Sequence, residues 1–326
     1  MSKTGKKMKL VILGAGGIGC YYGARLLANG NEVTFIARGE HLAALQRQGL
    51  RMRHPDFGFD DAIDACDLKH LLRNTQPSDF DALIVCIKAT ATHEVALDLH
   101  RWFDETGQKT AVVSLQNGVD NEGQLVDALG ADVVIGGLAV RIGGHIVCPG
   151  TVEATGVSQV VLGAWPGAGS ASDKRYGKRL ELLVDVFEQA QIPTRKVNNI
   201  RHELWKKLII NNGVNPLSAL TGMDTRTLSH HPDFAPLVLE MMRETAKAAA
   251  FDDETLTEQE VDEMFELIRN FDAIKTSMLV DFEKGRQLEV DAISGAVLQR
   301  NIQQGKSSPY TQTVYALLKH RITTAD

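Results

Sequence analysis

The chain has 326 residues, of which 44% are hydrophobic and 23% are charged, and its formal net charge is −6. This balance is typical of a globular protein, and the length is sufficient for two domains. With 41 acidic and 35 basic residues there is no broad basic field, which argues against nucleic acid as a partner. The basic N-terminal stretch precedes an apolar run of one strand's length, so we expect neither a signal peptide nor a membrane span.

A glycine-rich turn follows the first apolar segment. Residues 10–13 (LVIL) predict a short buried strand, a helix is predicted up to Asn29, and residues 33–36 predict a second strand. The turn between the first strand and the helix consists of Gly14, Ala15, Gly16, Gly17, Ile18 and Gly19, in the spacing G-x-G-x-x-G. This context predicts a dinucleotide-binding βαβ unit with the pyrophosphate at the helix N-terminus. A purely structural glycine turn is the alternative.

The end of the second predicted strand indicates which dinucleotide binds. A site for NAD usually has Asp or Glu at this point, where the carboxylate bonds the ribose 2′-hydroxyl. This chain has Ala37 and Arg38 instead. Because an arginine can form a fork of charge-assisted hydrogen bonds to a 2′-phosphate, the sequence favours NADP(H). A solvated surface arginine is the alternative.

The next part of the chain continues the alternation of helices and strands. The pattern predicts helices at 40–48 and 92–102, strands at 81–87, 110–115 and 133–135, and an acidic, hairpin-like excursion at 51–67. We expect Gly136-Gly137 to break the strand that begins at Val133.

Two polar residues follow predicted strands directly. Lys88 comes after 81–87, and Asn117 comes shortly after 110–115, before Gly118. Because ligands bind outside the carboxyl ends of the strands in an open α/β sheet, both are candidate cofactor contacts. The alternatives are a surface lysine and a simple turn residue.

The character of the sequence changes near Asn198-Asn199. Before this point we predict antiparallel strands within 141–161, a loop at 165–172, a helix at 178–189 and a short strand at 193–197. After it we predict helices at 200–221, 234–249, 258–271, 277–284, 291–304 and 309–320. We therefore expect an α/β protein. Residues 1–198 form a Rossmann-type, doubly wound sheet that binds NADP, and residues 199–326 form an all-helical substrate domain, with the substrate in the cleft between them.

The first helix of the second domain carries an unusual polar stripe. Lys207, Asn211 and Asn215 are spaced i, i+4 and i+8, which places them on one helix face. Reduction of a ketone builds negative charge on the carbonyl oxygen, and a positioned ammonium group can stabilise that charge and deliver a proton. Asparagines can hold polar substrate groups without adding charge. A solvated helix face is the alternative.

The cysteines indicate the compartment. Cys20, Cys66, Cys86 and Cys148 are far apart in the sequence and form no C-x-x-C pair. We expect reduced thiols and a cytoplasmic setting, without a metal site.

The sequence resembles the ketopantoate reductase (2-dehydropantoate 2-reductase) family over nearly its full length. The matching parts are the GAGGIG turn at 14–19, Arg38, Lys88, the QNG at 116–118, ELWKKLIINNGVNPL at 203–217 and SMLVDFEKGRQLEVDAISG at 277–295. The resemblance implies NADPH-dependent reduction of 2-dehydropantoate to (R)-pantoate, on the pathway to pantothenate and coenzyme A.

The resemblance also implies a role for each matching residue. Lys207 falls on the family's general acid, and Glu289 falls on a glutamate near the nicotinamide that supports the lysine. The implied substrate-binding residues are Asn117, Lys207, Asn211, Asn215 and Ser277. The implied cofactor-binding residues are Gly14, Ala15, Gly16, Gly17, Ile18, Gly19, Arg38, Lys88, Asn117, Ile142 and Glu289.

Two departures from the family leave the substrate open. Thr225 stands where some members have a further substrate-contacting asparagine, and residues 250–258 lack a glycine that often follows the preceding helix. We expect a small 2-oxo acid substrate, with 2-dehydropantoate as the first choice. The alternatives are a reductase of another 2-oxo acid or an imine, and a non-catalytic NADP(H)-sensing protein. A homodimer is one assembly that the sequence leaves open.

Overall fold

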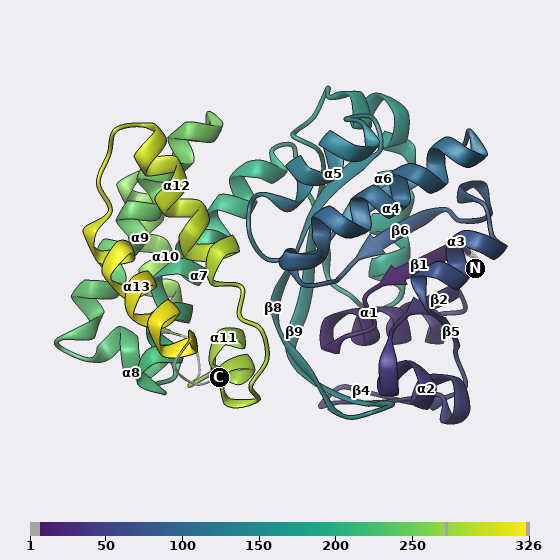
Figure 1. The fold of residues 1–326 in the computed structure, drawn as a ribbon, viewed down its shortest axis with the longest axis horizontal. Coiled ribbons are helices and arrows are strands. Elements are labelled where there is room, and N and C mark those ends of the chain that lie inside the picture. Colours follow the sequence, from purple (N-terminus) through teal and green to yellow (C-terminus); the bar gives the residue numbers. More distant parts are fainter. Residues whose placement is uncertain (1–6, 271–272, 324–326) are drawn as a thin grey trace. The chain divides into compact units, whose positions relative to one another are not determined.

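The computed structural model describes residues 7–270 and 273–323. The chain divides into two units, and Figure 1 shows its course through both. Unit 1 comprises Met1–Gln116 and Asn121–Ile200. Unit 2 comprises Asn117–Asp120 and Arg201–Asp326. A short segment from the middle of the α/β sequence therefore belongs with the helical part of the protein.

Unit 1 contains a ten-stranded sheet with the order β4-β3-β9-β8-β7-β6-β1-β2-β5, and β10 pairs with β9. The strands are β1 (Lys9–Leu13), β2 (Glu32–Ile36), β3 (Leu50–His54), β4 (Phe57–Asp61), β5 (Asp64–Cys66), β6 (Ala82–Val85), β7 (Ala111–Ser114), β8 (Val134–Cys148), β9 (Thr151–Ala164) and β10 (Thr194–Lys196). The predicted hairpin at 51–67 is confirmed as the antiparallel pair of β3 and β4.

The strand order has a reversal beside β1. The strands β5, β2, β1, β6, β7 and β8 are parallel to one another. β2 follows β1 on one side, and the chain then forms β3 and β4 at the opposite edge of the sheet, where β3 pairs with β9. β5 returns to pair with β2, and β6 lies on the other side of β1. Such a switch point is where open α/β sheets bind ligands. The predicted Rossmann-type, doubly wound sheet is confirmed.

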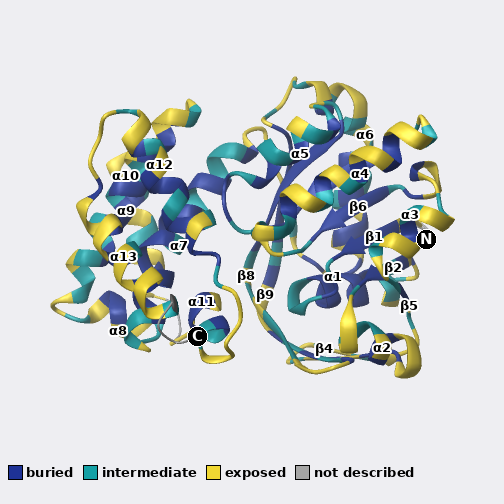
Figure 2. Ribbon diagram, viewed as in Figure 1, coloured by how far each residue is buried: buried dark blue, intermediate teal, exposed yellow. Residues whose placement is uncertain are grey.

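Helices cover the sheet of unit 1. They are α1 (Gly17–Ala28), α2 (Gly39–Gln48), α3 (Leu68–Asn74), α4 (Thr92–Thr106), α5 (Asn121–Leu129) and α6 (Ala171–Gln189), with the 3₁₀ turns η1 (Pro77–Asp79) and η2 (Ala89–Ala91). Leu10 and Ile12 of β1 share one hydrophobic core with Tyr22 of α1 and Phe187 of α6. Alternate residues of a strand point to opposite faces, so α1 and α6 cover the same face of the sheet. Figure 2 shows the central strands as the most buried part of this unit.

The expectation that Gly136-Gly137 breaks a strand is wrong. β8 runs through both glycines and pairs with β9 in the predicted antiparallel arrangement. The physical reason is close packing: a Cβ atom on Gly137 would lie 2.8 Å from the side chains of Leu115 and Leu162 and 2.9 Å from the carbonyl oxygen of Ser114. Glycine in a strand marks either a break or a place where neighbouring atoms pack closely, and at Gly137 it allows close packing.

Several helices differ from the sequence-based prediction. α3, α5 and the later helix α8 were not predicted, and α6 begins at Ala171, inside the segment expected to be a loop. The hydroxyl of Ser170 accepts a hydrogen bond from the Asp173 amide, which caps the start of α6. A serine in a Pro/Gly/Ser-rich stretch fits either a loop or a cap, and here it is the cap.

Unit 2 is helical, as predicted. Its elements are α7 (Ile200–Thr221), α8 (Thr225–His230), α9 (Phe234–Ala249), η3 (Ala250–Asp252), α10 (Glu258–Arg269), α11 (Ser277–Glu283), the π-helix η4 (Asp291–Gly295), α12 (Ala296–Gln303) and α13 (Pro309–Thr323). Its core includes Ile209 of α7, Met241 and Met242 of α9, and Val314 of α13. The predicted helical residue Phe271 lies outside the described residues. Within the described ranges, no helix is both long and apolar enough to cross a membrane.

Candidate active site

The glycine turn has the backbone geometry that the sequence predicts. Gly14 has φ +106°, a conformation that L side chains rarely adopt, and the carbonyl oxygen of Ile36 accepts hydrogen bonds from the amides of Gly14 (3.2 Å) and Ala15 (2.8 Å). At Gly16, the N-cap of α1, a Cβ atom would have no neighbour within 4 Å. The space at Gly16, at a helix N-terminus without an acidic residue in its first turn, fits a bound pyrophosphate. Gly17 serves close packing instead, because its Cβ atom would lie 2.1 Å from the backbone of Gly144.

The cofactor candidates follow one row of the parallel sheet. Leu13 pairs in register with Ile36 on one side and Val85 on the other, and Val85 pairs with Ser114. Gly14, Arg38, Lys88 and Asn117 come one to three residues after these four row members. Because the strands are parallel, the row marks a common carboxyl edge of the sheet. The register thus explains why residues so far apart in the sequence are candidates for one ligand.

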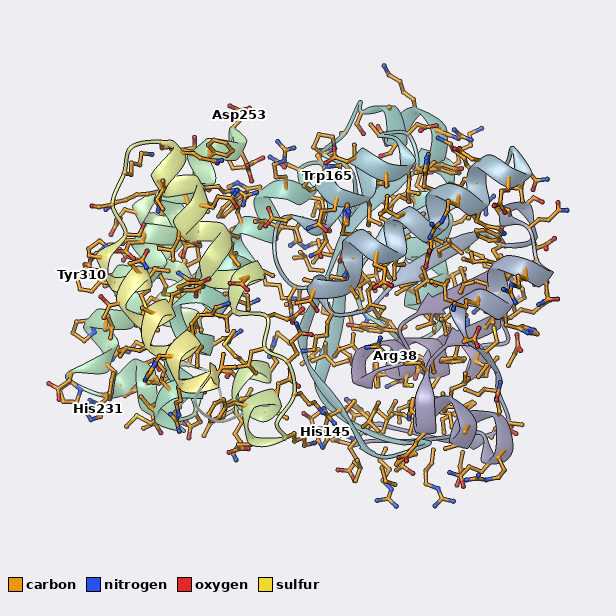
Figure 3. The ribbon with its side chains drawn as sticks, viewed as in Figure 1. Arg38, His145, Trp165, His231, Asp253 and Tyr310 are labelled. Atoms are coloured by element: carbon orange, nitrogen blue, oxygen red, sulfur yellow. The ribbon has the colours of Figure 1, made fainter. Side chains whose placement is uncertain are left out.

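Arg38 and Lys88 are both exposed at this edge. Arg38 is the N-cap of α2, and Lys88 is the N-cap of η2. Within residues 7–270 and 273–323, the guanidinium of Arg38 forms no ion pair, so its charge is available to an anion. Figure 3 labels Arg38 among the purple N-terminal elements. These positions fit an NADP(H) site.

Ile142 lies on β8, away from the strand ends. It pairs with Gly156 of β9 just after an irregularity in the register at Val140, and Arg141 between them has φ +53°. The side chain of Ile142 is half-buried and packs against the core that contains α1. A backbone contact to the cofactor at this position stays a prediction.

The polar stripe of unit 2 lies on one continuous helix. α7 spans Lys207, Asn211 and Asn215, so the spacing of four residues does place them on one face. Lys207 and Asn211 are half-buried, while Asn215 is only 6% exposed. A purely solvated face would leave all three exposed, and the burial of Asn215 argues against that alternative.

Asn117 and Glu289 meet inside unit 2. The Asn117 amide (Nδ2) donates to the Glu289 carboxylate (Oε2) at 3.4 Å, although the two residues are 172 positions apart in the sequence. The Glu289 side chain is buried, at 7% exposure, and the π-helix η4 begins two residues later. Single π-helical turns interrupt α-helices frequently at functional sites. This contact joins two of the candidate residues directly.

Ser277 and Thr225 belong to neighbouring segments of unit 2. Ser277 is exposed at the first position of α11, directly after the N-cap Thr276. The Thr225 amide donates to the Ile274 carbonyl oxygen (3.0 Å), and the Thr225 hydroxyl accepts from the Ile274 amide (3.4 Å). Thr225 therefore holds the segment that leads into Ser277.

The sequence analysis missed a buried polar centre at Asn212. This side chain is 0% exposed, and its Nδ2 donates to the hydroxyls of Thr245 (2.9 Å) and Thr311 (3.2 Å), while its Oδ1 accepts from the Ser294 hydroxyl (2.8 Å). It links α7 to α9, η4 and α13. The available signal was its position three residues after the apolar Ile209, inside the buried stripe of the helix.

Titratable groups near the glycine turn are held uncharged. Burial raises the pKa of the Cys20 thiol far above its ordinary value and that of Cys86 to about 12. Burial also lowers the pKa of His41, although a hydrogen bond with the Ala15 backbone acts in the opposite direction. His41 Nδ1 accepts from the Gly150 amide at 3.2 Å, which requires an unprotonated nitrogen. All four cysteines are free thiols.

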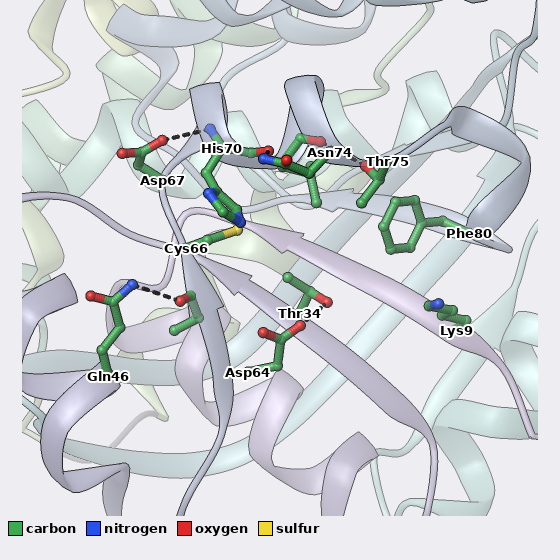
Figure 4. A pocket seen from close by; sticks show the side chains of 12 residues that line it. Lys9, Thr34, Gln46, Asp64, Cys66, Asp67, His70, Asn74, Thr75 and Phe80 are labelled. Carbon is green, nitrogen blue, oxygen red and sulfur yellow. Dashed lines mark hydrogen bonds between the residues drawn. The ribbon is translucent and has the colours of Figure 1, made fainter.

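A pocket in unit 1 is lined by other residues. It has a volume of about 310 Å³ and contains none of the predicted site residues (Figure 4). Its wall includes Thr34, which donates to Asp64 at 2.6 Å, and Gln46, which donates to the Ala65 carbonyl oxygen at 3.0 Å. These polar groups already have partners. In the described part of the chain, no group of three His, Cys, Asp or Glu side chains is arranged to hold a metal ion.

A parallel sheet with its glycine turn at the switch point, joined in sequence to a helical unit, is the architecture of a nicotinamide-dependent oxidoreductase. Comparison with known proteins specifies the family. The family model described as ketopantoate reductase PanE/ApbA matches residues 10–167, and the model of the C-terminal part of the same family matches residues 199–322. The chain belongs to the ketopantoate reductase family. It is an NADP-dependent oxidoreductase that acts on a CH–OH group.

Individual relatives cover almost the whole chain. A 2-dehydropantoate 2-reductase of Mesorhizobium japonicum is 30% identical over 96% of this chain and 97% of its own length. The crystal structure of 2-dehydropantoate 2-reductase from Methylococcus capsulatus superposes with a TM-score of 0.80 at 28% identity and covers 96% of both chains. A D-mandelate dehydrogenase in complex with NADH and anilino(oxo)acetate superposes with a TM-score of 0.86 at 22% identity and covers 97% of this chain and 99% of its own. This last likeness concerns the fold alone.

Proposed function

We propose that the protein reduces 2-dehydropantoate to (R)-pantoate with NADPH, the reaction that the names of its relatives indicate. In this proposal Lys207 is the general acid and Glu289 supports it. Asn117, Asn211, Asn215 and Ser277 hold the substrate. Residues 1–198 bind the cofactor and 199–326 bind the substrate, and the free thiols suit a reducing compartment such as the cytoplasm.

The observation that carries the proposal is the contact between Asn117 and Glu289. It brings a buried carboxylate and an amide together in the same unit as the helix with Lys207. A protein that only senses NADP(H) has no need for a buried carboxylate beside an amide. The pairing is therefore better explained by chemistry than by cofactor binding alone.

The residues have separate tasks in the reaction. The glycine turn at 14–19 and Arg38 would hold NADPH, which would supply a hydride for the carbonyl carbon of the 2-oxo acid. The Lys207 ammonium stabilises the negative charge that develops on the carbonyl oxygen and donates a proton to it, which gives the hydroxyl group. Lys207 then regains a proton from solvent. The Glu289 carboxylate supports the lysine, and the asparagine amides orient the substrate without adding charge.

A panel of 2-oxo acids tests the proposal. We expect NADPH oxidation, followed by absorbance, to be fastest with 2-dehydropantoate and much slower with unhydroxylated 2-oxo acids. Absence of NADPH oxidation with every acid, in protein that binds NADPH, would leave the sensing role instead. Faster turnover of another acid would keep the reductase chemistry and change the substrate.

One observation favours a second candidate, a reductase of another 2-oxo acid on the same fold. The Thr225 hydroxyl is engaged by the Ile274 backbone. A side chain occupied in this way has less capacity to contact a substrate. The panel distinguishes the two candidates directly.

A further inference from the structure

Arg300 lies at the centre of a compact ionic cluster in unit 2. Its side chain is only 11% exposed, and its guanidinium donates to Asp120 (Nη2 to Oδ1, 2.6 Å) and to Asp252 (Nε to Oδ2, 3.0 Å). The guanidinium also lies over the ring of Trp205, 5.3 Å from its centre. The Trp205 indole N–H donates to the same carboxylate oxygen of Asp252 at 3.2 Å. The arginine thus has a carboxylate on two sides and an aromatic face beneath it.

The cluster involves segments close in sequence to Asn117, Lys207 and Glu289. Asp120 ends the segment that begins with Asn117, whose amide meets Glu289. Trp205 is on α7, two residues before Lys207. Arg300 is on α12, which continues directly from η4, and η4 starts two residues after Glu289.

We propose that Arg300 is a positioning residue, and that its ion pair with Asp120 holds residues 117–120 in place so that Asn117 stays beside Glu289. The segment is only four residues long and both of its chain neighbours belong to unit 1. Such a segment needs an anchor of its own within unit 2. The Asp120–Arg300 pair supplies it, because a charge-assisted bond to a rigid guanidinium fixes direction as well as distance. The kinetic consequence rests on the proposed reductase function, whereas the structural one does not.

Asp120→Asn is the appropriate variant to test this. Arg300 keeps Asp252 as its counterion in that variant, so no buried charge is left unpaired, and the Asp120 side chain is already 38% exposed. The matched control is Glu240→Gln. Glu240 pairs at 2.7 Å with Arg243, which also has a second carboxylate partner, Glu258, and the Glu240 side chain is 35% exposed. Each variant removes one of the two carboxylate partners of an arginine, and only Asp120→Asn affects residues 117–120.

The first measurement is steady-state kinetics with NADPH and the best 2-oxo acid. We expect Asp120→Asn to lower kcat/KM about tenfold, the effect of a lost charge-assisted hydrogen bond, with a fall in kcat as well as a rise in the KM for the acid. Glu240→Gln should match the wild type. Arg300→Met combined with Asp120→Asn should be no worse than Arg300→Met alone, because both changes cut the same bond.

The second measurement is hydrogen exchange by mass spectrometry on the peptide that contains residues 117–120. We expect faster exchange in Asp120→Asn and no change in Glu240→Gln. This readout needs no substrate, so it stays informative if the wild type reduces none of the acids and the proposed function fails. Wild-type exchange of this peptide in Asp120→Asn, or equal kinetic losses in Asp120→Asn and Glu240→Gln, would overturn the positioning role.

Discussion

At the scale of single residues, we propose that Arg38 determines the choice of cofactor. Its guanidinium is exposed at the end of β2 and forms no ion pair in the described part of the chain. We expect Arg38→Ala to weaken NADPH binding by roughly 1.5–3 kcal/mol, or about tenfold to 150-fold, the value of a hydrogen bond to a charged group. NADH binding should change little, because it has no 2′-phosphate. Fluorescence titration of both cofactors measures the difference.

Arg47→Ala is the control for this prediction. Arg47 is also exposed and lies in the last turn of the same helix, α2. It should leave both cofactors unaffected. Equal weakening of NADPH and NADH in Arg38→Ala would mean that the arginine contributes general structure instead of reading the phosphate.

Lys207 is the residue on which the proposed chemistry depends most. We expect Lys207→Ala to lower kcat by about 10²–10⁴, the usual contribution of a positioned general acid, with the NADPH dissociation constant nearly unchanged. Lys206→Ala is the neighbouring control, because Lys206 lies on the same helix but pairs with Glu260 at 3.8 Å. Turnover near the wild-type rate in Lys207→Ala would remove this lysine from the mechanism.

His41 makes a pH-dependent contribution to the stability of unit 1. Burial holds its folded-state pKa below the ordinary value of 6.5. The unfolded chain therefore takes up the proton first as the pH falls below about 6.5, and the free energy of unfolding decreases in that range. Protonation of His41 Nδ1 also removes the hydrogen bond that this nitrogen accepts from the Gly150 amide.

The variants His41→Asn and His41→Gln separate the charge from the hydrogen bond. The Asn Oδ1 occupies the position of His Nδ1 and can accept from the Gly150 amide at any pH, whereas the Gln amide lies at the Nε2 position. Urea unfolding from about pH 7 to about pH 5 should show a shallower decrease of stability in His41→Asn than in the wild type. His41→Gln should be less stable across the range. A wild-type slope in His41→Asn would contradict the assignment.

The roles of the asparagines were not equally predictable from the sequence. The stripe of Lys207, Asn211 and Asn215 follows from helical spacing alone, and α7 has it as predicted. The role of Asn212 was not predicted, because it depends on hydroxyl groups of three other elements, and residue spacing along one helix does not reveal them. The contact of Asn117 with Glu289 is equally non-local, and the sequence analysis did not predict it, because the resemblance to a family implied only a separate role for each residue.

At the scale of elements, β8 shows why glycine is ambiguous in a sequence. A glycine pair can end a strand or can allow a neighbouring chain to approach, and only the packing decides. We expect Gly137→Ala to destabilise the protein by about 1–3 kcal/mol, the cost of overpacking, because its Cβ would meet Leu115 and Leu162 at 2.8 Å. The midpoint of urea unfolding measures this.

Gly143→Ala is the control in the same strand. The nearest atom to its Cβ would be the Thr155 hydroxyl oxygen at 3.5 Å, which is an ordinary contact. This variant should be as stable as the wild type or slightly more stable, because alanine has less backbone freedom to lose than glycine. Equal destabilisation by both variants would show that the loss of stability does not depend on how closely neighbouring atoms pack around Gly137, and the packing argument would fail.

At the scale of the whole molecule, the sequence predicted two parts but not which segments compose them. The sheet, its glycine turn and the helical second half follow from local periodicity. The sequence indicates a turn after a strand at residues 117–120, yet these residues belong to unit 2. The partner that anchors them, Arg300, is 180 positions from Asp120, and local patterns carry no information about such a pair. The boundary between 198 and 199 stays a prediction.

The last prediction concerns substrate choice by unit 2 as a whole. On C3, 2-dehydropantoate has a hydroxymethyl group, which carries the C4 hydroxyl, where 2-oxoisovalerate has a hydrogen atom. Asn211 and Asn215 of α7 and Ser277 of α11 offer more polar groups than a plain 2-oxo acid needs, and Asn215 is buried. A substrate without the hydroxyl would leave those groups unpaired, at about 1–3 kcal/mol for each group. Rejection of 2-oxoisovalerate could then approach about 10⁴-fold, as in other sites built around a substrate hydroxyl.

The measurement is kcat/KM for the two acids in the wild type, Asn215→Ala and Ser277→Ala. Each variant should lose activity mainly with 2-dehydropantoate, so that the ratio between the two acids falls. Wild-type values within about threefold of each other, against the ratio expected for a hydroxyl-reading site, would contradict the prediction. The polar residues of α7 and α11 would then serve the carboxylate and the carbonyl group that all 2-oxo acids share.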